Sequence, residues 1–505
     1  MKAYYDFMKE ISADELYDGL LGYGLFAEKL PPVFSAVPFL DYCKTNPGFK
    51  RIDQDFVSFN SMRNINIPRL MSIPTPFQYE GLCSELKKNW PNLLQHFQAN
   101  TVGQPYPISR IHIRKMYDKA KQSYKPELFE MNYKRWQDDG SPENELLITA
   151  SKVNKYVVHA DISTCFPSIY SHALPWALVG KDIAKGNRNS KLWFNKIDKS
   201  CQRIKNGETH GLMIGPHTSN LLSEIILVVV DKNLWDKGHK FLRHIDDYDC
   251  YVDSYEEAQR FLNDLGFELR QFDLPMNYKK TKIEELPVSS TEHWIHRLNA
   301  MSLVASYGKT SYREVNSYID LAIKLTEQVS DAAVLKYAIK ALAGVKNMTN
   351  NGKAIAGKRL MHIAILYPYL LTLMETYVFD KYAVNTDDIM QFANALYNDS
   401  LRIDNFEGIC YAIYFSLKYG FDISNIDCKT LIDTRDCLTM LFTWLYYRNR
   451  GGVETQMLES EARNLNNSSM ERYWLFVYEI LNDTDLNDDW QTMKKKGVSF
   501  IIKGI

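Results

Sequence analysis

Residues 156–166 read YVVHADISTCF, and residues 241–252 read FLRHIDDYDCYV. In the first stretch a β-branched run ends at Asp161, which predicts a strand that fixes the direction of a carboxylate. In the second, Asp246 and Asp247 lie between two short apolar runs, which predicts the tip of a β-hairpin. Taken alone, Asp161 could equally cap a following helix, and an Asp-Asp pair is typical of an exposed turn.

The three aspartates together have a chemical interpretation that neither stretch has alone. Mg²⁺ prefers a few carboxylate oxygens and completes its shell with water and substrate phosphates. Two such ions ~3.5–4 Å apart serve in-line phosphoryl transfer. Asp161, Asp246 and Asp247 therefore form a candidate two-metal site for Mg²⁺, with Mn²⁺ as an alternative.

The motifs around these aspartates resemble those of reverse transcriptases, in the same order along the chain. Residues 161–166 match the first palm motif, an Asp followed five residues later by an aromatic. The other matches are the fingers motif RLMSIP at 69–74, the Gly-rich turn GLMIGPHTS at 211–219, HIDD at 244–247 and NYKKT at 277–281. The resemblance implies an α/β reverse-transcriptase-like polymerase domain with a palm and fingers.

The resemblance also implies roles at the metal site. Asp161 and Asp246 would bind or bridge both metal ions, and Asp247 would support the site as the third catalytic carboxylate and metal ligand. The main-chain carbonyl of Ile162 would supply a further metal oxygen.

The resemblance implies that four more residues contact the nucleotide. Phe166 would act as the aromatic gate that clashes with a ribose 2′-OH, and Gly215 would let the backbone approach the base pair closely. Lys280 would lie near the triphosphate, and Arg69 would bind its γ-phosphate. The alternatives are a core role for Phe166 and simple surface charge for Lys280 and Arg69.

The sequences of residues 161–178 and 215–219 are most similar to those of bacterial abortive-infection reverse transcriptases, the AbiK-like proteins and their prophage-encoded relatives. That family implies a protein-primed, template-independent DNA polymerase that acts in phage defence in the bacterial cytoplasm. Its substrates would be dNTPs, its product single-stranded DNA attached to a Tyr, and its assembly a homo-oligomer, a trimer or a hexamer. The early candidates for priming are Tyr4, Tyr5, Tyr17, Tyr23 and Tyr42.

Two departures from the usual motifs leave other functions open. His244 stands where Tyr is usual, and Met213-Ile214 stand where template-using enzymes often have Pro-Gln. The chain could instead be a template-directed reverse transcriptase, or an inactive polymerase-like scaffold that binds nucleic acid. Three clustered carboxylates repel one another without a metal, which argues against the scaffold.

Periodicity divides the 505 residues into three predicted regions. Prolines break residues 1–150, the N-terminal and fingers region, into short pieces, whereas residues 151–304, the palm, alternate strand and helix patterns. Residues 305–505 repeat apolar side chains at helical spacing, such as Tyr318, Ala322 and Leu325. We expect an all-α, helical-repeat (HEAT-like) domain there.

The charge balance excludes a basic coat over the whole chain. There are 60 Lys and Arg residues against 61 Asp and Glu residues. Positive charge is concentrated in residues 110–135, net +5, and residues 181–205, net +6. These windows are either solvated helix faces or the lining of a nucleic-acid channel.

No membrane segment is expected. The longest purely apolar run, residues 225–230, is far shorter than the ~20 residues that a membrane helix needs. Eight cysteines without a C-x-x-C pair favour free thiols in a reducing cytosol.

Overall fold

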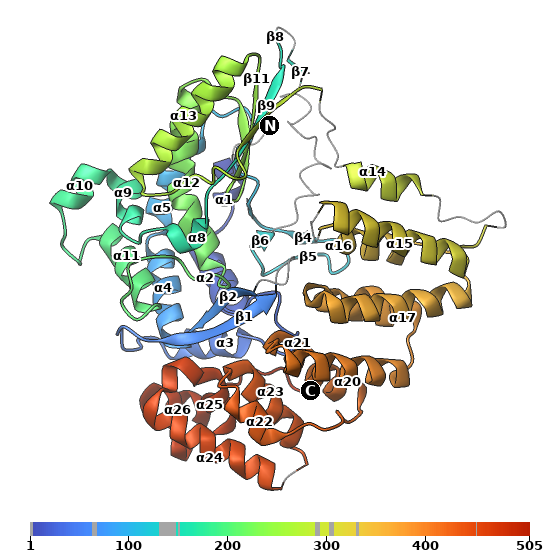
Figure 1. Ribbon diagram of the computed structural model, residues 1–505. Coiled ribbons are helices and arrows are strands. Elements are labelled where there is room, and N and C mark those ends of the chain that lie inside the picture. The colour runs from blue at the N-terminus through green and yellow to red at the C-terminus, as the bar shows by residue number, and fades with distance from the viewer. Residues whose placement is uncertain are drawn as a thin grey trace. The chain divides into compact units, whose positions relative to one another are not determined.

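The computed structural model describes residues 4–62, 68–130, 148–149, 152–287, 293–301, 308–329, 333–450 and 452–504. The chain divides into two units (Figure 1). The first unit contains Met1–Ala27, Ser35–Phe56 and Ser72–Val288; the second contains Glu28–Phe34, Val57–Met71 and Ser289–Ile505. The predicted boundaries at 150/151 and 304/305 lie outside the described residues and stay predictions.

A four-stranded antiparallel sheet carries the functional motifs of the first unit. Its strand order is β10 (Phe241–His244), β11 (Asp247–Val252), β9 (Tyr156–Asp161) and β12 (Lys282–Glu285). Val157 and Val158 of β9 are buried, as β-branched residues favour in a central strand. Helix α13 (Tyr255–Gln271) contacts β9 and β11, and it also packs against α12 (Thr218–Asp236), whose apolar run 225–230 lies inside the unit.

The remaining elements of the first unit are short. Gly22 of α2 packs on Leu40 of α3, and the hydroxyl of Tyr79 on α4 donates to the main-chain oxygens of Leu20 and Gly24. The helices are α1 (Tyr4–Met8), α2 (Ala13–Tyr23), α3 (Val37–Thr45), α4 (Pro76–Lys88), α5 (Trp90–Thr101), α8 (Cys165–Ser168), α9 (Ala173–Val179), α10 (Lys181–Gly186) and α11 (Trp193–Arg203). The strand pairs are β3 (His112–Ile113) with β6 (Phe129–Glu130), β4 (Tyr117–Asp118) with β5 (Ser123–Tyr124), and β7 (Ile148–Thr149) with β8 (Lys152–Val153).

The helix at His293–Ala300 lies in the region predicted as palm, but it belongs to the second unit. As expected from the periodicity after residue 305, the described residues from 308 onward form helices. Asn385, Asn405, Asp427 and Asp436 cap four of them by accepting a hydrogen bond from the third helical amide. The α-helices are α14 (His293–Ala300), α15 (Tyr312–Val329), α16 (Ala333–Ala343), α17 (Asn350–Leu366), α18 (Leu371–Met374), α19 (Asp380–Tyr382), α20 (Thr386–Arg402), α21 (Phe406–Tyr419), α22 (Cys428–Asp433), α23 (Cys437–Tyr447), α24 (Val453–Ser468), α25 (Trp474–Ile480) and α26 (Asp488–Lys495). The 3₁₀ turns are η1 (Pro368–Leu370), η3 (Met470–Tyr473) and η4 (Asp483–Asp485), and η2 (Glu375–Phe379) is a π-helical turn.

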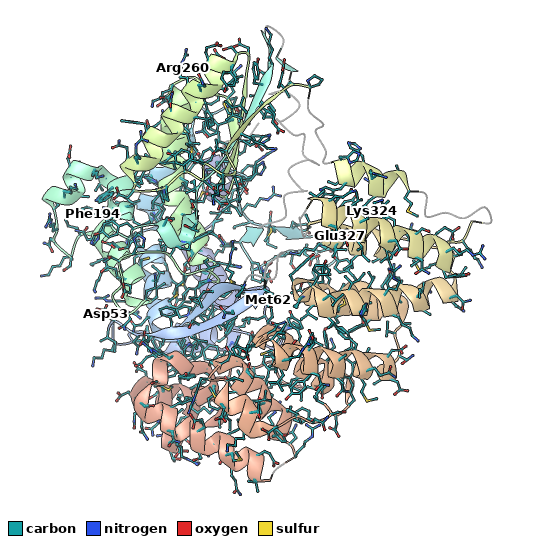
Figure 2. All side chains as sticks on the ribbon, viewed as in Figure 1. Asp53, Met62, Phe194, Arg260, Lys324 and Glu327 are labelled. Carbon is teal, nitrogen blue, oxygen red and sulfur yellow. The ribbon has the colours of Figure 1, made fainter. Side chains whose placement is uncertain are left out.

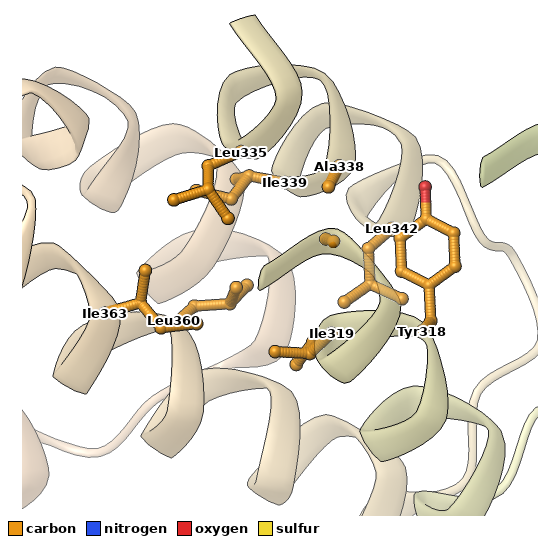
Figure 3. A pocket seen from close by; sticks show the side chains of 9 residues that line it. Tyr318, Ile319, Leu335, Ala338, Ile339, Leu342, Leu360 and Ile363 are labelled. Atoms are coloured by element: carbon orange, nitrogen blue, oxygen red, sulfur yellow. The ribbon is translucent and has the colours of Figure 1, made fainter. Parts of the chain in front are cut away.

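In the second unit, α15 packs against both α16 and α17, and α17 packs against α20. Helices α15, α16 and α17 enclose a small apolar pocket (Figure 3). Its lining residues are Tyr318, Ile319, Ala322, Leu335, Ala338, Ile339, Leu342, Leu360 and Ile363. Among the helices of the described ranges, none combines the length and apolar character that a bilayer crossing requires. All eight cysteines are free and buried.

Strand β1 (Phe56–Met62) pairs with β2 (Pro68–Pro74), and its end is tied to α21 within the second unit. The Glu407 carboxylate accepts hydrogen bonds from the Met62 amide at 2.7 Å and the Ser61 hydroxyl at 3.1 Å (Met62 is labelled in Figure 2). Burial raises the pKa of Glu407 to about 7. A buried acceptor therefore holds a segment more than 300 residues away in the sequence.

We expect Glu407→Ala to lower the free energy of unfolding by ~2–4 kcal/mol, because two buried donors lose their acceptor. The matched variant Glu407→Gln keeps an amide oxygen for Met62 and should lose much less. Urea-unfolding midpoints at pH 7 distinguish the two. Equal midpoints for both variants would show that the acceptor does not matter.

Candidate active site

Asp161 and Asp247 face each other across two adjacent strands. Asp161 ends β9, Asp247 begins β11, and the antiparallel register makes them direct partners. Directly opposed residues place their Cβ atoms ~4.5–5.5 Å apart on one face of the sheet. The sheet thus brings together two carboxylates that are far apart in the sequence.

Asp246 lies in the two-residue turn between β10 and β11. The preceding residue, Ile245, has φ +63°, a conformation that is costly for a β-branched residue. The turn is held from one side by the Ile162 amide, which donates to the Asp246 carbonyl at 3.0 Å. The sheet therefore maintains a strained turn beside the paired carboxylates.

Side chains from the segment before β12 hold the Asp161 carboxylate. The Asn277 amide donates to Oδ1 at 2.8 Å, and Lys280 Nζ lies 2.7 Å from Oδ2. Asp161 is buried, whereas the Lys280 side chain is 64% exposed. The ammonium group thus reaches the carboxylate from the solvent side.

The carboxylates divide their negative charge unequally. Burial, a hydrogen bond to Asp161 and the charges of Asp246 and Asp161 raise the pKa of Asp247 to about 7, although the side chain keeps access to solvent. Burial opposes ionisation of Asp161, but hydrogen bonds from Lys280, Asn277 and protonated Asp247 lower its pKa below the ordinary value. Asp247 therefore binds a proton more readily than Asp161 does.

Beneath the turn, a buried ion cluster involves Arg243 of β10. Its guanidinium, 0% exposed, contacts Glu224 at 2.7 Å and Asp231 at 2.7 Å, both on α12. The same guanidinium donates to the Ile245 carbonyl at 2.9 Å. Although burial opposes the charge, Asp231 and Glu224 raise the pKa of Arg243. This cluster joins α12 to the strained residue of the turn.

Three other residues that the sequence predicted for the site lie near Asp161 in the chain or pack against neighbouring segments. Ile162 is fully buried and follows Asp161 directly. Phe166 lies half-buried on α8, and its carbonyl accepts from the Leu212 amide at 2.7 Å. Gly215 has φ +134°, and a Cβ there would lie 2.8 Å from the Ser72 carbonyl oxygen, so its backbone is packed against β2.

Arg69 belongs to the second unit. It is half-buried on β2 (Pro68–Pro74), in the part of that strand that precedes Ser72. The γ-phosphate role of Arg69 stays a prediction, and the residues that the structure brings together around the sheet are Asp161, Asp246, Asp247 and Lys280.

The donor set suits a hard divalent cation. The pKa of Asp247 is raised while that of Asp161 is lowered, which is the behaviour of crowded negative charge. In the described ranges the structure contains no preformed cluster of three or more His, Cys, Asp or Glu side chains that would hold a metal ion. In this structure the Lys280 ammonium supplies the positive charge beside Asp161.

Sequence reasoning missed the Arg243 cluster. The available signal was two acidic residues, Glu224 and Asp231, at the ends of an otherwise apolar helical run. Such carboxylates need a buried partner, and Arg243 is the basic residue beside the HIDD motif. Asn277 belongs to the recognised NYKKT motif, but its hydrogen bond to Asp161 was not anticipated.

Comparison with known proteins defines no family. No protein-family model matches the chain, and no curated protein matches it. Among solved structures, apo telomerase from Candida tropicalis is similar over 81% of this chain and 72% of that chain, with 11% identity and a TM-score of 0.33. The same telomerase in complex with a TWJ fragment of telomeric RNA gives 72% and 64% coverage, 12% identity and a TM-score of 0.32.

A telomerase from Candida tropicalis truncated from its C-terminal domain aligns with 50% of this chain and 54% of its own length, at 14% identity and a TM-score of 0.28. The chain thus spans 54% of the truncated telomerase and 64% of the telomerase in the RNA complex. TM-scores this low do not establish a common fold.

We expect Asp247→Asn to change how stability depends on pH in metal-free protein. The raised pKa means that the native state keeps a proton between about pH 4 and 7 that the unfolded state releases, so wild-type stability falls as pH rises through this range. The variant lacks this contribution. Thermal melts in EDTA from pH 4 to 8 should therefore show the variant gaining relative to the wild type with rising pH. Parallel curves for the variant and the wild type would contradict the raised pKa of Asp247.

We expect Arg243→Met to cost ~3–5 kcal/mol of unfolding free energy, because two buried carboxylates lose their counter-charge. Adding Glu224→Gln and Asp231→Asn should recover part of the loss. The control Lys232→Met removes an exposed ion pair with Asp236 on the same helix and should change little. Urea-unfolding midpoints measure all three. No recovery in the combined variant would mean that charge is not the cause.

Proposed function

We propose that this chain is a reverse-transcriptase-like nucleotidyltransferase that polymerises dNTPs at the carboxylates of its sheet. The observation that carries the proposal is the direct pairing of Asp161 with Asp247, beside Asp246 in the turn. The crowded charge of these groups, reflected in the raised pKa of Asp247, supports cation binding. The ordered motifs at 161–166, 211–219, 244–247 and 277–281 support a polymerase palm.

Asp161, Asp246 and Asp247, with the Ile162 carbonyl, would hold Mg²⁺ or Mn²⁺. When bound, the ions supply charge stabilisation for phosphoryl transfer. Asp247 would give up its proton on metal binding, and the Lys280 ammonium would be free to turn from Asp161 to the triphosphate. The exposure of Lys280 supports this exchange, because its side chain already reaches solvent.

The remaining residues would position the nucleotide. In this proposal Phe166 excludes a 2′-OH, Gly215 shapes the backbone near the base pair, and Arg69 binds the γ-phosphate. The main-chain hydrogen bond from Leu212 to Phe166 supports the role of Phe166 in excluding a 2′-OH, because it holds this aromatic residue beside the Gly-rich segment. The close packing of Gly215 on Ser72 gives a structural reason for glycine there.

We further propose that synthesis is template-independent and primed by a Tyr of the chain. In this view the protein is an abortive-infection polymerase of the bacterial cytoplasm that acts in phage defence as a homo-oligomer, a trimer or a hexamer. The wording of residues 161–178 and 215–219 supports this membership. The reaction would join a Tyr oxygen to the α-phosphorus of a dNTP and release pyrophosphate.

The early tyrosines differ in how well their burial suits a priming role. Tyr4, Tyr17 and Tyr42 are buried, and burial raises the pKa of the Tyr4 and Tyr17 hydroxyls, which opposes their use as nucleophiles. Tyr5 and Tyr23 are half-buried. Tyr278 is 74% exposed and directly follows Asn277, which bonds to Asp161.

The test is incorporation of labelled dNTP by purified full-length protein with Mg²⁺ and no added template. We expect label that stays with the protein on denaturing gels, and an adducted Tyr in peptide mass spectra. Asp246→Asn and Asp247→Asn should each reduce incorporation by at least 10³-fold, since the site would lose charge stabilisation. Asp236→Asn, an exposed carboxylate on α12, is the matched control and should keep full incorporation.

Other outcomes point to the other functions. Incorporation that requires an added RNA template and primer would identify a template-directed reverse transcriptase. Phage resistance that survives in the combined Asp246→Ala/Asp247→Ala variant, with no incorporation by the wild type, would identify an inactive scaffold.

A further inference from the structure

An aromatic cluster lies on α9 and in the residues just before it; helices α9 and α10 are at the left of Figure 1. The ring centroids of Tyr170 and His172 are 4.8 Å apart, and those of Tyr170 and Trp176 are 5.8 Å apart. Lys181 Nζ lies 4.1 Å from the Trp176 ring centroid, and Lys185 Nζ lies 5.8 Å from it. All three rings are partly exposed.

Positive charge surrounds this cluster. Lys185, Arg188, Lys191 and Lys196 are exposed along α10, the following loop and α11. Within the described part of the chain, none of these four has an acidic side chain at ion-pair distance. Lys199, in contrast, pairs with Asp53 at 3.0 Å, so that it adds no free charge.

The acidic residues of this region do little to offset that charge. Asp198 is buried, where it accepts from Gln202 at 2.7 Å and contacts His172 Nδ1 at 2.5 Å. Asp182 is the acidic residue that remains exposed between 181 and 205. The chain as a whole has a net charge of −1, so this surface departs strongly from the average.

The cluster is continuous in the chain with the candidate active site. Tyr170 follows Phe166 by four residues and forms a β-bridge with His210. The Gly211 amide donates to the Ile169 carbonyl at 2.8 Å. Main-chain hydrogen bonds therefore join the segment that carries the aromatic rings to the Gly-rich segment that begins at Gly211.

We infer that the surface formed by Tyr170, His172, Trp176, Lys185, Lys191 and Lys196 binds single-stranded nucleic acid. Lysines pair with phosphates of any polyanion, but partly exposed rings among them add stacking partners for unpaired bases. Duplex bases are already stacked on one another, and a lipid surface would be met by an apolar face rather than by rings capped with ammonium groups. The surface goes beyond the proposed catalysis, since it needs neither metal nor nucleotide.

The test is fluorescence anisotropy of a labelled 20-residue oligothymidylate with the full-length protein in EDTA, without dNTP. The variant Lys185→Glu/Lys191→Glu/Lys196→Glu should weaken binding at least tenfold. It should also flatten the slope of log K against log salt by about 2, because each single-strand phosphate contact contributes ~0.7. Trp176→Leu should weaken binding about tenfold, whereas Trp176→Phe should retain most of it, since a stacking ring remains.

The matched control carries the same charge change elsewhere: Lys429→Glu/Lys496→Glu/Lys503→Glu, three exposed lysines of the second unit. It should bind as the wild type does. Equal losses in the two triple variants, unchanged binding by the first, or Trp176→Leu binding as tightly as Trp176→Phe would each overturn the inference. So would equal affinity of the wild type for a 20-base-pair duplex. The inference would also fail if the first triple variant lost binding to anionic vesicles but kept its binding to the oligonucleotide. If the wild type bound the oligonucleotide but incorporated no dNTP, that result would count against the proposed catalysis and not against this surface.

Discussion

The guanidinium of Arg243 lies between Glu224 and Asp231 and also bonds to the Ile245 carbonyl. A buried charge is tolerated only where its partners satisfy it, so this cluster fixes the distance between α12 and the β10–β11 turn. Ile245 would otherwise leave the left-handed conformation, which is costly for a β-branched side chain. The direction of Asp246 and Asp247 thus depends on the Arg243 guanidinium, which hydrogen-bonds to the residue that precedes them.

The strands of the candidate site could be predicted from the sequence because their signals are local. A β-branched run ending at Asp161 and two apolar runs around Asp246 and Asp247 specify strands and a hairpin, and the structure contains both. The helical pattern after residue 305 is equally local, because apolar side chains recur at the helix period. The roles of these residues, in contrast, were proposed from resemblance.

The contacts that join distant segments could not be predicted in this way. Nothing in the residues near Asp161 indicates that Lys280 would reach its carboxylate, since the contact depends on how β12 pairs with β9. The attachment of Met62 to Glu407 likewise depends on tertiary packing. The burial of Tyr4 and Tyr17, two of the early tyrosines, likewise could not be inferred from their position in the chain.

The second unit takes its residues from three separate parts of the chain, and this affects synthesis on the ribosome. Phe34 forms a β-bridge with Ile501, and the Ile502 amide donates to the Val33 carbonyl. At ~5–20 residues per second, the early segment waits roughly half a minute to a minute and a half for these partners. A nascent chain therefore carries an incomplete helical unit long after the sheet of the first unit has emerged. During that interval the incomplete unit is a binding site for a chaperone.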